Sequence, residues 1–105
     1  MSETLKKIDK MLTDSPIFLF MKGNPEFPMC GFSARAVHAL RAVNATFQTF
    51  NVLEDDEIRQ GIKEYANFPT IPQLYINKQL IGGSDIVLEL YESGDLEKMV
   101  KEAKA

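Results

Sequence analysis

A short apolar run, Ile-Phe-Leu-Phe-Met at residues 17–21, constrains the fold of this chain more than any other segment. The run contains no polar residue and lies between turn signals, with Pro16 before it and Gly23 and Pro25 after it. A continuous apolar run of this length is typical of a strand that is buried on both faces. A sheet built around such a strand must be covered on both faces.

Apolar residues at helical spacing predict several helices. The first is ended by Asp14, Ser15 and Pro16, and Asp55 is the expected N-cap of the third. The predicted helices cover residues 5–12, 31–42, 55–65, 85–91 and 96–100.

Three further strands are predicted. Residues 46–52 have the β-branched and aromatic content of a strand. Pro69 and Pro72 forbid a helix before the strand 73–76, and a turn at 77–78 leads into the strand 79–81. The order predicts an α/β fold in one domain, residues 1–105: a thioredoxin-like, four-stranded mixed sheet with helices on both faces. Its first two strands should be parallel and its last two antiparallel.

Charge and hydropathy exclude several classes of function. The net charge is -3, whereas a nucleic-acid binder normally presents a basic face. No apolar run approaches the roughly 20 residues that span a bilayer, so we expect no membrane contact. The N-terminal residues lack the apolar core of a signal peptide, and the chain has one cysteine. We therefore expect a cytoplasmic protein.

Cys30 is the only cysteine, and it follows a loop and precedes a predicted helix. A Cys-x-x-Cys redox pair would need a thiol at position 33, where the chain has Ser33, so any thiol partner must come from another molecule. Free cysteines are often small buried hydrophobes, but the loop edge disfavours that interpretation. His38 is the only possible histidine base, and it lies about 12 Å further along the helix, beyond hydrogen-bond reach.

Two functions for this thiol remain open. The positive end of the helix dipole and a cation such as Lys22 would favour a thiolate, which could exchange with glutathione mixed disulfides. Alternatively, the thiolate could bind an iron–sulfur cluster. A [2Fe-2S] centre usually takes four thiolates. Two chains would supply two, and small thiols such as glutathione would supply the others.

Three motifs occur in order: Lys-Gly-x-x-x-x-Pro-x-Cys-Gly-Phe-Ser within 22–33, Pro-Thr-Ile-Pro-Gln-Leu at 69–74 and Gly-Gly-Ser-Asp at 82–85. Together they resemble the monothiol glutaredoxins of the Cys-Gly-Phe-Ser class, particularly the single-domain bacterial members. The resemblance covers essentially the whole chain. It departs from many relatives at Phe68, where they have tryptophan, and at Ser84, where some have a second cysteine.

The resemblance implies roles for individual residues. Cys30 would be both the glutathione-reactive thiolate and the cluster ligand. Lys22 and Arg59 would contact the glycine carboxylate of glutathione, and the main chain of Ile71 would pair with its cysteinyl part. Ser84 and Asp85 would hold its γ-glutamyl end. Pro72 would be the cis-proline of the fold.

The resemblance also implies a function. The expected protein is a [2Fe-2S] cluster carrier, a homodimer bridged by one cluster with two Cys30 thiolates and two glutathiones as ligands. It would pass the cluster to apo iron–sulfur acceptor proteins and would form heterodimers with a BolA-like protein. Two alternatives remain: a glutathione-dependent thiol–disulfide oxidoreductase working through Cys30, and a regulatory module that senses iron through its partner.

Overall fold

The computed structural model describes residues 2–103 and contains the predicted four-stranded mixed sheet. The strand order is β2-β1-β3-β4. Strand β1 (Ile17–Met21) is parallel to β2 (Gln48–Asn51) and antiparallel to β3 (Gln73–Ile76), which pairs in turn with β4 (Gln79–Gly82) in the antiparallel sense. Both predicted strand directions are confirmed.

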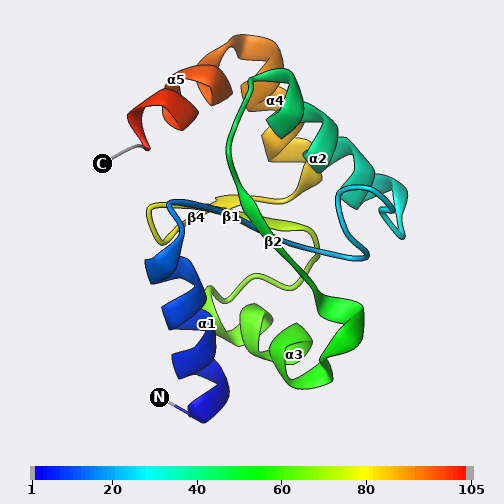
Figure 1. Cartoon of the computed structure of the whole chain (residues 1–105), viewed down its shortest axis with the longest axis vertical. Coiled ribbons are helices and arrows are strands. Elements are labelled where there is room, and N and C mark those ends of the chain that lie inside the picture. Colours follow the sequence, from blue (N-terminus) through cyan, green and yellow to red (C-terminus); the bar gives the residue numbers. More distant parts are fainter. Residues whose placement is uncertain (1, 104–105) are drawn as a thin grey trace.

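Helices cover both faces of this sheet, as Figure 1 shows. Helices α1 (Glu3–Asp14) and α3 (Asp56–Tyr65) lie on one face. Helices α2 (Gly31–Ala42), α4 (Ser84–Ser93) and α5 (Asp95–Glu102) lie on the other. No helix among residues 2–103 is long and apolar enough to cross a membrane.

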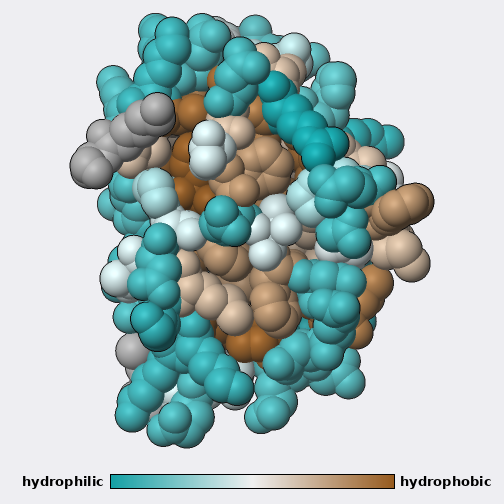
Figure 2. All heavy atoms as spheres, viewed as in Figure 1, coloured by the Kyte–Doolittle hydropathy of each residue, from teal (hydrophilic) through white to brown (hydrophobic). Residues whose placement is uncertain are grey.

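The central strand β1 contributes to two hydrophobic cores. Ile17, Leu19 and Met21 pack with α2, α4 and α5, whereas Phe18 and Phe20 pack with α1 and α3. All five side chains are 6% exposed or less. Full burial of such a side chain stabilises the fold by about 1.5–3 kcal/mol. The apolar run therefore stabilises the packing of helices on both faces of the sheet. In Figure 2, apolar residues gather above and below β2, where the two cores meet the edge of the sheet.

The prediction of a strand over 46–52 was wrong at both ends. Strand β2 begins at Gln48, because its pairing with β1 runs only from Phe18 opposite Gln48 to Met21 opposite Asn51. After Asn51 the chain forms a short 3-10 helix, η1 (Val52–Glu54). The Asn51 side chain accepts a hydrogen bond from the N–H of Leu53 at 3.0 Å, which turns the chain out of the sheet.

Local signals set the other boundaries. Asp55 is the N-cap of α3, as predicted, because its carboxylate accepts from the N–H of Ile58 at 3.0 Å. The turn at Asn77 and Lys78 is confirmed, with positive φ angles of 50° and 68°. Such angles are those of the tight turns that join antiparallel strands. The Ile71–Pro72 bond is cis, as expected for Pro72.

Candidate functional site

One cavity collects the predicted binding residues at the end of the sheet where β1 ends and β3 begins. It has a volume of about 670 Å³, within the range of small-molecule sites. Its walls come from the end of β1, the start of α2, helix α3, the segment before β3 and the start of α4. All five predicted binding residues line it: Lys22, Arg59, Ile71, Ser84 and Asp85.

The thiol of Cys30 lies beside this cavity rather than in its lining. Lys22 and Phe32, on either side of Cys30 in the sequence, do line it. Cys30 is the N-cap of α2, and the N–H of Ser33 donates to its Sγ at 3.3 Å. The thiol is therefore placed at the positive end of a 12-residue helix, where a negative charge is stabilised.

Ser33 connects the thiol to the main chain of Lys22, the residue that follows β1. Its hydroxyl oxygen accepts from the N–H of Lys22 at 3.1 Å and from the thiol of Cys30 at 3.3 Å. The Ser33 side chain is fully buried. When the thiol ionises, the hydroxyl proton is available to the sulfur, since the oxygen already accepts from Lys22.

The pKa of Cys30 is set by opposing effects. Partial burial raises it. The hydrogen bonds from the Ser33 hydroxyl and from the N–H groups of Ser33 and Phe32, with the charge of Lys22, outweigh burial and hold the pKa of this thiol below its ordinary value. A lowered pKa increases the fraction of thiolate, the form that attacks disulfides and binds metals.

His38 takes no part in this arrangement. It is exposed on α2, and its ring centroid lies 6.4 Å from that of Tyr91. The Cys30 side chain is hydrogen-bonded to Ser33 and not to His38. The expectation that His38 is a solvated helix residue is confirmed.

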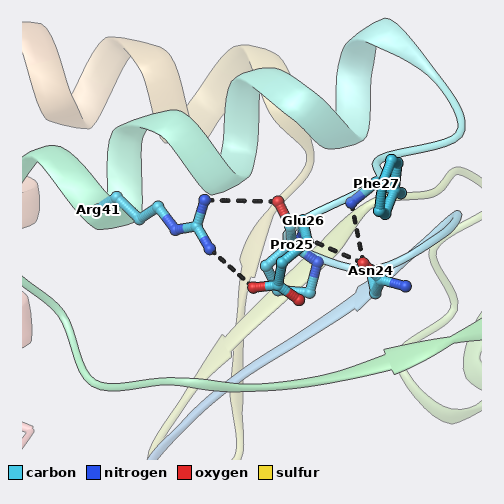
Figure 3. Close-up of polar contacts among 5 residues, drawn as sticks. All are labelled: Asn24, Pro25, Glu26, Phe27 and Arg41. Atoms are coloured by element: carbon cyan, nitrogen blue, oxygen red, sulfur yellow. Dashed lines mark hydrogen bonds and ion pairs between the residues drawn. The ribbon is translucent and has the colours of Figure 1, made fainter.

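The loop between Lys22 and Cys30 has its own internal structure. The N–H of Met29 donates to the carbonyl of Lys22 at 2.8 Å, and Gly23 donates to Oδ1 of Asn51 at 2.9 Å. Figure 3 shows the tip of the loop, where the Asn24 side chain accepts from the N–H groups of Glu26 and Phe27.

Arg41 fastens the loop tip to helix α2. It donates to the carbonyl of Pro25 at 3.4 Å and to the carboxylate of Glu26 at 3.1 Å (Figure 3). Hydrogen bonds therefore hold the loop that leads to the thiol both at its base and at its tip.

The cavity is cationic. Of the lining residues within 2–103, three are positively charged, Lys22, Arg59 and Lys63, and one is acidic, Asp85. Such a lining favours a ligand with more than one carboxylate, and Asp85 offers one place for an ammonium group. The sequence interpretation included two of these three cations and missed Lys63, which follows Arg59 by one helical turn on α3.

The start of α4 offers hydrogen-bond groups to a ligand. The N-cap is Gly83, which has no side chain to bind the first N–H groups of the helix. The hydroxyl of Ser84 is buried and has no hydrogen-bond partner among residues 2–103. A methyl group at Gly83 would lie 3.7 Å from the ring of Phe68, so this helix start and the segment before β3 form adjoining walls.

Sequence reasoning missed the roles of Ser33 and Asn51. Their bonds to the main chain of Lys22 and Gly23 span 11 and 28 residues of sequence. Neither periodicity nor a local motif can predict contacts between residues so far apart in the sequence. A third residue, Gln73, was read only as the first residue of a strand, and its side chain is fully buried.

The glutaredoxin family model matches residues 17–81. The chain belongs to the glutaredoxin family. It is 50% identical over 103 residues to a protein of Synechocystis called an uncharacterized monothiol glutaredoxin, ycf64-like, and the match covers 98% of this chain and 96% of that one. With its single cysteine, this glutaredoxin is of the monothiol type.

Solved structures confirm the thioredoxin-like glutaredoxin fold. The solution structure of reduced poplar apo GrxS14 has a TM-score of 0.82 and 47% identity, covering 93% of this chain and 90% of the poplar chain. The crystal structure of a buckwheat glutaredoxin–glutathione complex has a TM-score of 0.85 and 26% identity, covering 97% and 91%.

Proposed function

We propose that this monothiol glutaredoxin carries [2Fe-2S] clusters, each held between two subunits by two Cys30 thiolates and two glutathiones. The observation that carries the proposal is a single activated thiol beside a cationic cavity of small-molecule size. The cluster is the cargo of the protein, and glutathione is its co-ligand.

The number of donor groups supports a shared cluster. Among residues 2–103 no group of three or more His, Cys, Asp or Glu side chains is arranged to hold a metal. One chain offers one thiolate, whereas a [2Fe-2S] cluster takes four. Two chains and two small thiols meet that number.

The cavity suits glutathione. This tripeptide has two carboxylates and one ammonium group, which correspond to the three cations of the cavity and to Asp85. Lys22 and Arg59 would bind the glycine carboxylate, the Ile71 main chain would pair with the cysteinyl part, and Ser84 and Asp85 would bind the γ-glutamyl end. The buckwheat glutaredoxin that shares this fold was solved with glutathione bound.

Each residue then has a physical task. Cys30 supplies the thiolate, a form that the α2 N-terminus and Ser33 favour by lowering the pKa of this thiol. The cavity holds a glutathione sulfur next to it, so that one subunit presents two sulfur ligands to a cluster. We place this function in the cytoplasm, with apo iron–sulfur proteins as acceptors and a BolA-like protein as an alternative to the second subunit.

The lowered pKa of Cys30 also favours a second function, glutathione-dependent reduction of mixed disulfides. The thiolate would attack the glutathione sulfur of a protein–glutathione disulfide and release the protein thiolate. A second glutathione would then attack the resulting Cys30–glutathione disulfide, which releases glutathione disulfide and the Cys30 thiolate. Rapid turnover of a mixed-disulfide substrate by cluster-free protein would favour this function over cluster transport.

Anaerobic reconstitution with iron, sulfide and glutathione tests the carrier function. The expected product is a coloured dimer, and neither the colour nor the dimer should form with Cys30→Ala. His38→Ala is the control, because His38 is exposed and forms no hydrogen bond with the thiol. A colourless monomer from the unaltered protein would sink the proposal.

A further inference from the structure

Gln73 lies behind the wall of the cavity formed by residues 68–72. Its side chain is fully buried, yet both ends of its amide are hydrogen-bonded. Nε2 donates to the carbonyl of Phe68 at 2.9 Å, and Oε1 accepts from the hydroxyl of Tyr75 at 2.8 Å. A buried amide with both groups satisfied is held in a single position.

Tyr75 is one of the two groups that set which way the amide points, the other being the Phe68 carbonyl. Its hydroxyl proton has to be donated, because Tyr75 is only 1% exposed and burial, with a smaller effect of Tyr65, raises the pKa of its phenol. The acceptor that faces it must be the oxygen of the Gln73 amide. The amide nitrogen of Gln73 therefore faces the Phe68 carbonyl, so the donor to residues 68–72 is held by a residue outside the cavity.

The wall itself has few other hydrogen bonds. Pro69 and Pro72 lack an N–H group, and no main-chain hydrogen bond of residues 69–72 is found within the described part of the chain. At the start of the segment, the N–H of Phe68 donates to the carbonyl of Lys63 at 3.0 Å. The carbonyl of Phe68, its other main-chain polar group, is bonded to the Gln73 side chain.

We propose that Gln73 is a positioning residue that holds the wall 68–72, and with it the Ile71 main chain, in the geometry that a thiol tripeptide needs. It does so from behind, without touching the ligand. The part of this inference that concerns the ligand rests on the proposed binding of glutathione, whereas the part that concerns the wall does not.

A matched pair of variants isolates the Gln73–Phe68 hydrogen bond. Tyr75→Phe removes the bond between Tyr75 and Gln73 but leaves the donor to Phe68 in place, because the Phe68 carbonyl can accept only from the nitrogen end of the amide. The double variant Gln73→Met with Tyr75→Phe loses the same bond and, in addition, the donor to Phe68. Methionine has about the length of glutamine, so the two proteins differ chiefly in whether the Phe68 carbonyl is bonded. If the Gln73→Met, Tyr75→Phe variant does not fold, Gln73→Asn with Tyr75→Phe replaces it. The asparagine amide is too short to reach the Phe68 carbonyl.

The wall is measured first, in ligand-free protein. We expect the backbone order parameters of Thr70 and Ile71 to stay near the rigid value of about 0.85 in Tyr75→Phe and to fall toward the flexible range, below about 0.6, in the double variant. Equal order parameters in the two proteins would overturn the inference, whatever the protein binds.

Glutathione affinity is measured next, by titration calorimetry. We expect about tenfold weaker binding in the double variant than in Tyr75→Phe, the size that follows from losing one hydrogen bond to a buried group. The pKa of Cys30 should be the same in both, because the groups that lower it, Ser33, Phe32 and Lys22, lie outside the wall and are unchanged. Equal glutathione affinities in the two variants would contradict the positioning role. A difference in the Cys30 pKa between them would also contradict it, because the change would then extend beyond residues 68–72. If the unaltered protein binds no glutathione, the proposed function fails, and the order parameters alone decide the role of Gln73.

Discussion

At Cys30 the balance between burial and hydrogen bonding determines the charge of the thiol. Burial opposes ionisation, and the Ser33 side chain is the strongest of the groups that favour it. Ser33→Ala removes that group and leaves the helix N-terminus intact, so we expect the pKa of Cys30 to rise. The rate of alkylation by iodoacetamide, followed against pH, measures it. Ser93→Ala, at the far end of α4, is the control and should leave the profile unchanged.

The same lowered pKa makes stability depend on pH. Because folding lowers the pKa of Cys30, the ionised thiol contributes stability that is fully present above the unfolded value, about 8.5, and is lost as pH falls through the folded pKa. We expect the unfolding free energy of the unaltered protein, relative to Cys30→Ala, to increase as pH rises through this window. Urea unfolding at several pH values measures it. A pH-independent difference would show that the thiol titrates alike in the folded and unfolded chains.

Lys22 and Arg59 should be separable by experiment. Each faces the cavity, so Lys22→Gln and Arg59→Gln should each weaken glutathione binding about tenfold, as expected for losing a hydrogen bond between charged groups. Only Lys22→Gln should also raise the pKa of Cys30, because Lys22 but not Arg59 acts on the thiol. Calorimetry and thiol titration measure the two effects. Lys98→Gln, on α5, is the control for net charge, and equal thiol pKa values in Lys22→Gln and Arg59→Gln would contradict the assignment.

Among the elements, the loop before α2 has the strictest backbone requirement. Gly23 has φ +87°, and a Cβ there would lie 2.3 Å from the carbonyl oxygen of Phe27 and 2.7 Å from the nitrogen of Met29. Gly23→Ala should therefore cost at least about 1–2 kcal/mol, the penalty of the left-handed conformation alone. Urea unfolding measures it.

Gly31, one residue after Cys30, provides the matched control. It lies in α2, and a Cβ there meets nothing within 4 Å. Gly31→Ala should leave stability unchanged or raise it by up to about 1 kcal/mol, through helix propensity. Equal losses in the two variants would mean that the loop does not require its glycine.

Much of the fold follows from local patterns. Helix α2 was predicted with its observed bounds, Gly31–Ala42, because the apolar positions on one face repeat at helical spacing. Strand β2 was not, because its length is set by its partner: β1 pairs with it over only four residues, and the Asn51 side chain then starts the 3-10 turn. Strand ends that depend on pairing cannot be seen in one segment alone.

The site shows the same division. The residues expected to touch glutathione were inferred from the family resemblance, and the fold gathers them around one cavity. Their supports were not found. Ser33 acts on Lys22 and Cys30 together, Gln73 reaches back to Phe68, and Asn51 crosses from β2 to Gly23. The positions of these three residues form no sequence pattern that predicts a contact. Their partners can be identified only in the folded structure.

At the scale of the whole molecule, exposed apolar side chains surround the partly buried thiol. Three apolar side chains on the loop and the start of α2 are largely exposed: Phe27 at 74%, Met29 at 64% and Phe32 at 55%. Arg35 lies over the ring of Phe32, with its guanidinium carbon 5.3 Å from the ring centroid. Such exposure around Cys30 is compatible with the proposed change from a cluster-free monomer to a cluster-bridged dimer.

Native mass spectrometry of the anaerobically reconstituted protein tests the cluster-carrier proposal most directly. A shared cluster predicts one species whose mass equals two chains, one [2Fe-2S] unit and two glutathiones, and which returns to single chains when the cluster is removed. Cys30→Ala should give single chains only. A cluster bound to one chain, or a dimer whose mass contains no glutathione, would contradict the proposal.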